Sequence, residues 1–340
     1  MITDRGAREV ALAGWARQML GRLQGEAGSD LALYPASDDA SFRRYFRGRT
    51  AMGSFIFVDA PPAQEDSEPF VRIAGLLGDA GLNAPLVLAS DLELGFMMQT
   101  DLGDTQLQDL LNRETPGQVQ AVYEAAVDTI HRMQSIEADL PAYDEALLRQ
   151  EMGLFNEWFL HRQLGIRTSP VEDALIESVF ARLVTSALEQ PVVFVHRDFH
   201  CRNIMIQPDR SLGIIDFQDA VNGPVTYDLV SLLRDCYHRF APQEVARLLA
   251  LFREGLVQGG LRPDIAEASF QRWFDWMGMQ RHLKCVGIFS RLNLRDGKPR
   301  YLADIPLVFS YLSEVSHLYP ELAPFGDWLD ERVAPALARL

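Results

Sequence analysis

The sequence predicts an α+β protein of two lobes, a small N-terminal lobe built on a five-stranded antiparallel sheet and a larger, mainly helical C-terminal lobe. Residues 31–100 contain short segments rich in aromatic and β-branched residues, with turn residues between them. From Thr105 onward, long segments carry apolar residues at helical spacing. A chain of 340 residues also exceeds the size at which one hydrophobic core stops growing. We therefore expect lobes at 1–104 and 105–340, with a hinge at about 98–104.

The N-terminal lobe is expected to begin with an amphipathic helix at 7–24, because its large apolar residues fall near one face. Three strands should follow as an antiparallel meander, since the turn segments SDDA and RTAMG separate them. A helix at 68–81, stopped by Gly81, precedes the last two strands. The five expected strands are 31–36, 41–48, 54–60, 85–90 and 95–100.

The C-terminal lobe is expected to consist mainly of long helices, and three of them stand out by their periodicity, at 118–136, 145–165 and 171–188. After them, the apolar runs VVFV, IMI and LGII have the length of short strands. The polar residues between these runs should therefore lie on loops.

Composition restricts the classes of function. The formal net charge of -15 argues against a nucleic-acid partner, because a polyanion repels such a surface. The three cysteines are widely spaced, so neither a disulfide framework nor a zinc site is expected. Polar residues occupy the N-terminus where a signal peptide would be apolar, and no run approaches the length of a membrane span. We expect a cytoplasmic protein without a membrane partner.

The segments HRDFHCRNIM and GIIDFQDA carry the residues typical of phosphoryl-transfer chemistry. This chemistry needs a carboxylate that orients and deprotonates a hydroxyl, together with hard oxygen ligands that hold Mg²⁺. Asp198 suits the first role, and Asn203 and Asp216 suit the second. Alternatively, Asp198 and Asn203 are ordinary turn residues. His196 either has a chemical role or is a buried residue that supports the loop.

These two segments, together with GPVTYDLVSLL, resemble the aminoglycoside phosphotransferase and choline kinase family. The resemblance implies a protein-kinase-like fold, with a nucleotide-binding N-terminal lobe and a C-terminal lobe that holds the catalytic loop, metal site and substrate pocket. It implies ATP and Mg²⁺ as cofactors and assigns to Asp228 a role in ordering the active-site loops. Protein kinases themselves fit less well, because the chain has no G-x-G-x-x-G and no APE segment.

Longer segments, among them SDDASFRRYFR, NEWFLHRQLG and RHLKCVGIFSRLNLRDGKPR, are similar to the branch of anomeric sugar kinases that serve bacterial cell-wall recycling. Membership in this branch implies ATP-dependent phosphorylation of N-acetylmuramate, and also of N-acetylglucosamine, at the C1 hydroxyl, toward UDP-sugar precursors. Two alternatives stay open. One is a kinase for another small hydroxyl compound, such as an aminoglycoside, homoserine or choline, and the other is a nucleotide-binding pseudokinase that acts as a regulator.

The chain lacks the lysine that kinase folds place on the third strand to bind nucleotide phosphates. Only Lys284 and Lys298 are present, both in the C-terminal lobe. The neighbouring segment SFRRYFRGR offers substitutes, because an arginine can bind phosphate with its planar fork. We expect Arg43 or Arg44 to take this role, with the backbone around Ser41 and Phe42 cradling phosphate; the alternative is a solvated strand face. At the hinge, Gln99 and Asp101 are the positions expected to bind adenine.

Two groups of residues are candidates for the sugar substrate. The segment 281–300 has six basic residues and one acid, and Arg281 and Arg291 in it suit the carboxylate of N-acetylmuramate. On the helix 145–165, Asn156, Glu157 and His161 lie within about one turn of each other around Trp158, which suits the hydroxyls and the apolar face of a sugar. The alternatives are a solvated basic face and a core tryptophan. The expected partners are ATP and an amino sugar, and the sequence leaves the oligomeric state open.

Overall fold

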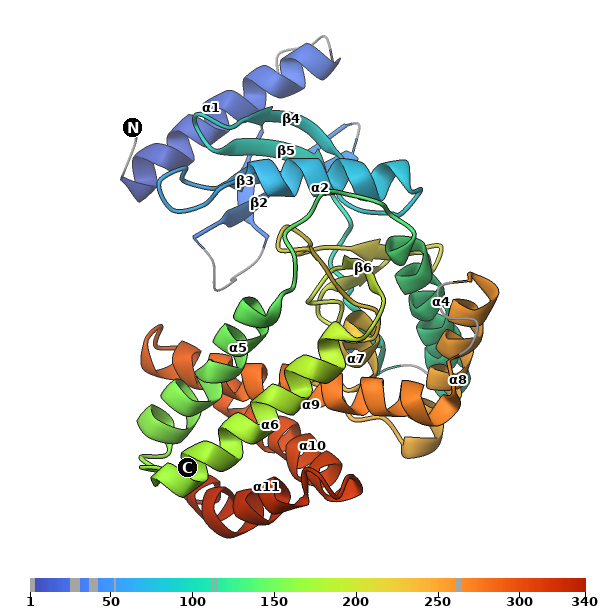
Figure 1. Cartoon of the computed structure of the whole chain (residues 1–340). Coiled ribbons are helices and arrows are strands. Elements are labelled where there is room, and N and C mark those ends of the chain that lie inside the picture. The colour runs from blue at the N-terminus through green and yellow to red at the C-terminus, as the bar shows by residue number, and fades with distance from the viewer. Residues whose placement is uncertain are drawn as a thin grey trace. The chain divides into compact units, whose positions relative to one another are not determined.

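The computed structural model describes residues 4–24, 31–36, 42–51, 53–111, 113, 115–260 and 265–340. The chain divides into two compact units (Figure 1). The first consists of residues Met1–Leu107 and Asn203–Asp219, and the second of Gln108–Arg202 and Ala220–Leu340. The predicted α+β class is confirmed, because the first unit holds a five-stranded antiparallel sheet and the second is mainly helical.

The first unit contains the expected helix, meander and strand pair. Its sheet has the order β1-β2-β3-β5-β4, and every neighbouring pair is antiparallel. Its elements in the N-terminal segment are α1 (Arg5–Gln24), β1 (Leu33–Pro35), β2 (Arg44–Thr50), β3 (Gly53–Asp59), α2 (Glu68–Asp79), β4 (Val87–Asp91) and β5 (Phe96–Thr100).

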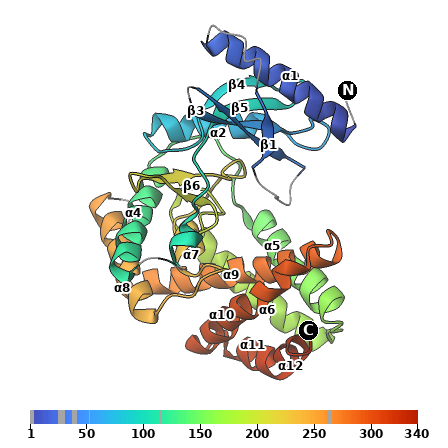
Figure 2. The same ribbon diagram turned by 180° about the vertical axis from the view of Figure 1, so that it is seen from behind.

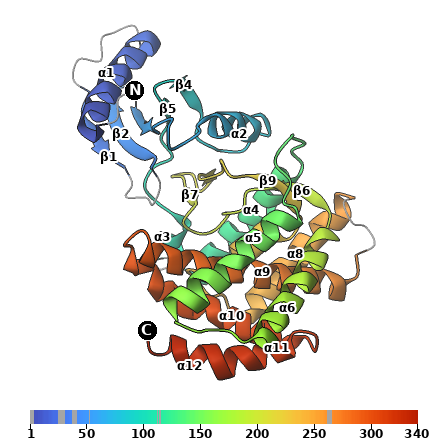
Figure 3. The same ribbon diagram turned by 60° about the vertical axis from the view of Figure 1, so that its left-hand side comes forward.

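Both faces of this sheet are covered. Successive residues of a strand point to opposite faces, and both Phe57 and Val58 of β3 have no exposed surface. On one face, Trp15 of α1 packs with Phe46 and Phe96 in a continuous apolar core. Figures 1 and 3 show α1 and α2 on opposite sides of the sheet. The strands are therefore fixed by burial on both sides, which gives the residues at their ends defined positions.

A short hairpin, β7 (Ile204–Ile206) and β8 (Leu212–Ile214), belongs to the first unit although it lies a hundred residues beyond the sheet in sequence. Backbone hydrogen bonds explain this assignment. The N-H of Ile206 donates to the carbonyl of Thr105, and that of Ile214 to the carbonyl of Asn83, both over 2.8 Å. The predicted strands IMI and LGII are thus present and pair with each other.

The second unit contains most of the helices and one two-stranded sheet, in which β6 pairs antiparallel with β9. Its elements are α3 (Leu107–Leu111), α4 (Pro116–Gln134), α5 (Glu145–Leu154), η1 (Phe155–Gln163), α6 (Pro170–Leu188), β6 (Val192–Val195), β9 (Val221–Pro224), α7 (Tyr227–Leu233), α8 (Pro242–Gln258), α9 (Glu267–Leu294), η2 (Pro299–Asp304), α10 (Ile305–Leu318), α11 (Ala323–Trp328), η3 (Leu329–Val333) and α12 (Ala334–Leu337).

Helix α9 is the central element of this unit and is visible along most of its length in Figure 2. It packs against α5, η1, α6, α7 and α10. Gly287 permits the approach to α5, because a Cβ at this position would lie 2.5 Å from the carbonyl carbon of Leu154. In the described part of the chain, no helix combines the length and apolarity that a membrane span requires.

One predicted helix differs from the observed structure. The periodicity predicts a single helix over 145–165, whereas the chain forms α5 as an α-helix and continues as a π-helix, η1, from Phe155. A π-helix has hydrogen bonds between residues five apart, whereas those of an α-helix join residues four apart. Over two or three turns, the spacing of apolar residues in the sequence is too similar to distinguish a π-helix from an α-helix. π-Helical turns are often found at functional sites.

Candidate active site

The loop after β6 is held by a buried carboxylate. Asp228, near the start of α7, accepts hydrogen bonds from the backbone N-H groups of His196 and Arg197, over 2.8 and 2.9 Å. Arg197 has a φ of 76°, a left-handed conformation that costs free energy for a residue with a side chain. Burial raises the pKa of Asp228 to about 6, although these two hydrogen bonds and the charge of His196 act in the opposite direction. The fold therefore maintains a strained conformation next to Asp198 at some energetic cost.

Asp198 follows this strained residue and is kept ionised. Its backbone N-H donates to Nδ1 of His196 over 3.3 Å, and its carbonyl accepts from the N-H of His200 over 3.0 Å. Burial alone would raise the pKa of Asp198, but the surrounding positive charges, Lys284 foremost, outweigh burial and bring it to about 2. At neutral pH this side chain is a carboxylate, which accepts hydrogen bonds from a hydroxyl group but is a weak base.

Glu151 of α5 is the centre of a buried network next to the same loop. Its carboxylate accepts hydrogen bonds from the hydroxyl of Tyr143 and from the guanidinium of Arg197. Its Oε1 also lies 3.0 Å from Nζ of Lys284, and that ammonium donates to the hydroxyl of Tyr227 over 3.1 Å. Burial raises the pKa of Glu151, but the charges of Lys284 and Arg197 have the larger combined effect and hold this pKa below its usual value. The network thus connects α5 and α9 to the residue that precedes Asp198.

Asn203 and Asp216 lie together at the open end of the hairpin β7–β8. The N-H of Ile215 donates to the carbonyl of Asn203 over 3.1 Å, and Nδ2 of Asn203 lies 3.3 Å from Oδ2 of Asp216. Asp216 has a φ of 66°, a second non-glycine residue in the left-handed region. An amide and a carboxylate placed side by side supply hard oxygen atoms of the kind that Mg²⁺ binds. These residues therefore fit the metal that the sequence predicts.

The structure gives Arg44 an internal partner. Arg44 lies opposite Asp59 in the β2–β3 register, and its Nε donates to Oδ2 of that carboxylate over 3.0 Å. Arg8 of α1 donates to Oδ1 of Asp59 over 2.7 Å. Asp59 has no exposed surface. The end of β3, the strand on which kinase folds carry their lysine, thus holds a buried acid between two arginines. The role of Arg44 in phosphate binding stays a prediction.

The other residues predicted to bind ATP occupy different places in the first unit. Arg43 is buried, with its guanidinium 5.4 Å from the ring centre of Phe70, whereas Phe42 is 61% exposed. Ser41 lies outside the described residues. Gln99 is buried in β5, and Asp101, just beyond it, forms an ion pair with Arg47 at 2.6 Å. Arg43 and Arg44 stay predictions, as do Ser41, Phe42, Gln99 and Asp101.

The residues predicted to bind the sugar are distributed over η1 and α9, which pack together. Glu157 and His161 of η1 are exposed, and Glu157 forms an ion pair with Arg162 at 2.8 Å. Arg281 of α9 is buried and donates to Sγ of Cys236 over 3.3 Å. Asn156 and Arg291 are half-buried. Their roles toward a substrate stay predictions.

The model of the phosphotransferase enzyme family matches residues 33–267. The chain belongs to this family. It is 45% identical, over 87% of each chain, to a Pseudomonas aeruginosa protein named N-acetylmuramate/N-acetylglucosamine kinase. A Neisseria meningitidis protein of the same name is 39% identical over 96% of each chain. The solved streptomycin–ATP complex of an aminoglycoside 2″-phosphotransferase matches 90% of this chain and 97% of the chain in that complex. The TM-score is 0.57 and the identity is 14%, and this likeness confirms the protein-kinase-like fold.

The central acid of the buried network in this phosphotransferase is not among the site residues that the sequence predicts. Glu151 is separated from Lys284 by 133 residues, so no spacing rule connects them. A local signal does exist, because Glu151 is flanked by the buried Leu148 and Met152 on the apolar side of α5. An acid on the apolar face of an amphipathic helix requires a partner, and this rule could have identified it.

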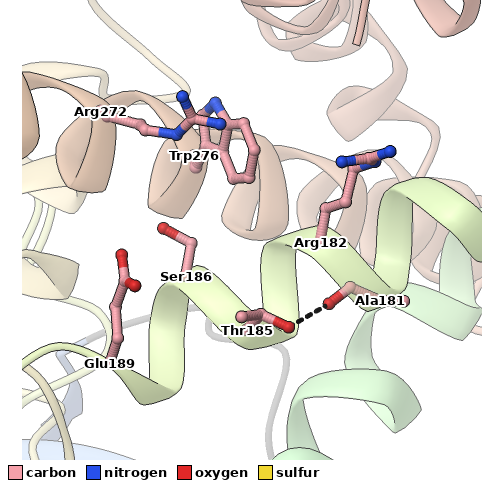
Figure 4. Close-up of a pocket in the computed structure, with 7 residues that line it drawn as sticks. All are labelled: Ala181, Arg182, Thr185, Ser186, Glu189, Arg272 and Trp276. Atoms are coloured by element: carbon pink, nitrogen blue, oxygen red, sulfur yellow. Dashed lines mark hydrogen bonds between the residues drawn. The ribbon is translucent and has the colours of Figure 1, made fainter. Parts of the chain in front are cut away.

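A separate pocket of about 380 Å³ opens between α6 and α9 of the phosphotransferase (Figure 4). Arg272 lies over the ring of Trp276 at 4.0 Å on the α9 side, and Thr185 donates to the carbonyl of Ala181 on the α6 side. None of the residues that the sequence predicts to bind substrate, metal or nucleotide lines it. This pocket is therefore distinct from the predicted site residues.

Proposed function

We propose that this phosphotransferase transfers the γ-phosphate of ATP to the anomeric C1 hydroxyl of N-acetylmuramate and N-acetylglucosamine. The observation that carries the proposal is the identity of 45% over 87% of the chain to a relative named for these two substrates. The ionised carboxylate of Asp198, on a loop held by Asp228, supports it, because phosphoryl transfer relies on positioning the acceptor hydroxyl. The products would feed cytoplasmic peptidoglycan recycling toward UDP-sugar precursors.

In this mechanism Asp198 acts mainly by orientation. A carboxylate with a pKa of about 2 is a weak base at neutral pH. An anomeric hydroxyl is more acidic than an ordinary alcohol, so it needs less help in losing its proton. Asp198 would accept a hydrogen bond from this hydroxyl, direct its oxygen toward the phosphorus, and take the proton as the new bond forms.

Asn203 and Asp216 would hold Mg²⁺, and this ion would supply positive charge against the negative charge of the phosphates. Gln218 Nε2 donates to Oδ1 of Asp216 over 2.9 Å, and this contact orients the carboxylate. On the nucleotide side, Arg43 or Arg44 would bind phosphate in place of the missing lysine. The hinge positions Gln99 and Asp101 would face the adenine.

Phosphorus NMR of the purified protein with ATP and Mg²⁺ tests this proposal. N-acetylmuramate and N-acetylglucosamine should each give a sugar 1-phosphate signal, whereas homoserine, choline and kanamycin should give none. In Asp198→Asn we expect turnover to fall by about a thousandfold or more while ATP affinity changes little, since the residue acts on the acceptor. Turnover of homoserine, choline or kanamycin instead of a sugar would reassign the substrate, and nucleotide binding without any product would favour a regulator.

A further inference from the structure

The basic residues of 281–300 differ in whether they have internal partners. Lys284 is bound by Glu151 and Tyr227, and Arg295 by Asp296 at 2.7 Å. Arg281 is 2% exposed and donates to the sulfur of Cys236. Arg300 lies 5.1 Å from the ring centre of Tyr301. The two remaining members of the cluster are Arg291 and Lys298.

Arg291 is a half-buried cation without a counter-charge of its own. Its Nε is buried and has no hydrogen-bond partner among the residues that the structure describes, and no ion pair joins it to an acid of that part of the chain. The two acids that influence it electrostatically, Asp296 and Glu157, are already paired with Arg295 and Arg162. Burial and the charge of Arg295 lower the pKa of Arg291, which means that the protein destabilises this cation. An anion bound here would remove that penalty.

The position of Arg291 is fixed by contacts on both sides of it along α9. Gly287 abuts Leu154 at the end of α5, and Nδ2 of Asn293 donates to Oε1 of Gln163 at the end of η1 over 3.0 Å. Arg291 therefore lies alongside the π-helix. In that helix, Oδ1 of Asn156 is a second buried polar atom without a partner among the described residues. The two packed helices α9 and η1 thus hold one unsatisfied donor and one unsatisfied acceptor.

The spacing along α9 relates Arg291 to the catalytic loop. Lys284 pairs with Glu151, which also binds Arg197, the residue directly before Asp198, so Lys284 marks the level of the catalytic loop on the helix. Arg291 is seven residues further on, which places it on the same face and about 10 Å along the axis. A sugar whose C1 hydroxyl meets Asp198 would extend toward Arg291, and N-acetylmuramate differs from N-acetylglucosamine by a lactyl carboxylate. The acetamido N-H of either sugar is a hydrogen-bond donor, and Oδ1 of Asn156 is an acceptor without a partner among the described residues.

We infer that Arg291 is the residue that binds the lactyl carboxylate of N-acetylmuramate and sets the preference for this sugar over N-acetylglucosamine. The inference rests on the proposed function for the identity of the two sugars. It reduces the basic cluster to one specificity-determining guanidinium, with Asn156 on the adjoining π-helix as a second, accepting group. The planar fork of arginine suits a carboxylate, which accepts two parallel hydrogen bonds.

The test compares kcat/KM for the two sugars in Arg291→Gln, Arg291→Lys and the matched control Lys298→Gln, which removes another cation of the cluster. Loss of a charge-assisted hydrogen bond should lower the muramate-to-glucosamine ratio in Arg291→Gln by about tenfold to a hundredfold. Arg291→Lys should recover part of the ratio, and Lys298→Gln should leave it at the wild-type value. Because both sugars are measured on the same preparation, partial misfolding cancels in the ratio.

An unchanged muramate-to-glucosamine ratio in Arg291→Gln would refute the inference. If the KM for ATP also rose in this variant, the result would assign Arg291 to nucleotide phosphate. Calorimetric binding of the two sugars to the wild type and Arg291→Gln separates this inference from the proposed function. Absence of sugar phosphorylation by the wild type would refute the proposed function. Equal binding ratios in the two proteins would refute the assignment of Arg291.

Discussion

Replacing Glu151 by glutamine should cost far more stability than replacing another glutamate of the same helix. The substitution keeps the shape of the side chain but removes the charge that faces Arg197 and Lys284. The side chains of Glu151 and Lys284 are only 7% and 8% exposed, so water cannot replace the lost carboxylate. Removing one partner of a buried ion pair typically costs about 3–5 kcal/mol. We expect the lower end of that range, because Asp198 stays near both cations and the substituted amide can still accept the hydrogen bond of Tyr143.

Urea unfolding followed by tryptophan fluorescence measures this cost, since Trp273 and Trp276 lie on α9. The control is Glu145→Gln at the start of α5, where the ion pair with Arg149 is largely exposed and should contribute about 0.5 kcal/mol or less. Adding Lys284→Met to Glu151→Gln should recover stability, because it removes a buried charge that has lost its partner. The explanation would be refuted if Glu151→Gln and Glu145→Gln were equally stable.

Two further predictions concern Asp228 and the arginines before and within β2. The folded pKa of Asp228, about 6, exceeds its ordinary value of 3.8, so the folded state binds the proton more tightly and the free energy of unfolding should fall as pH rises from about 4 to about 6. The fall amounts to at most about 3 kcal/mol. Urea titrations across this pH range should show this fall in the wild type and not in Asp228→Asn. Parallel pH profiles of the two proteins would contradict the prediction. Arg43→Ala should raise the KM for ATP by about tenfold or more, whereas Arg44→Ala should mainly lower thermal stability by leaving Asp59 with Arg8 alone. The opposite pattern in the two variants would assign the phosphate to Arg44.

The sequence was sufficient for the class of the fold and for the elements of the N-terminal sheet and its two helices. The strands of the first unit alternate in burial or are flanked by clear turn residues, and burial on both faces then confirmed their assignment. Helix α6 begins at Pro170 after Ser169, whose side chain accepts from the N-H of Glu172, and this capping box is visible in the sequence itself. Local rules work for such elements because each is determined by residues three or four positions apart.

The site residues that the sequence predicts most directly are close together along the chain. Asp198, Asn203 and Asp216 fall within one strand–loop–hairpin segment, so a local motif finds them. The partners that ionise and support Asp198 come from α5 and α9, which are brought together only by tertiary packing around Gly287. Their contribution is electrostatic and depends on burial, and neither quantity is encoded in spacing along the chain.

The absence of the kinase lysine also becomes interpretable once the two faces of β2 are known. Arg44 lies on the face with Phe46, where the guanidinium is 5.5 Å from the ring centre and α1 covers the sheet. There Arg44 serves to neutralise Asp59. Arg43 precedes it and points to the other face, onto the ring of Phe70 at 5.4 Å. Phe70 in turn lies 4.8 Å from Phe217, the neighbour of Asp216, which is predicted to bind metal. Arg43 also lies 3.5 Å from Glu65, whose side chain is partly exposed, whereas Asp59 beside Arg44 is fully buried. Because the packing of Arg43 leads through Phe70 to the predicted metal ligands, we expect the loss of Arg43, and not that of Arg44, to weaken ATP binding.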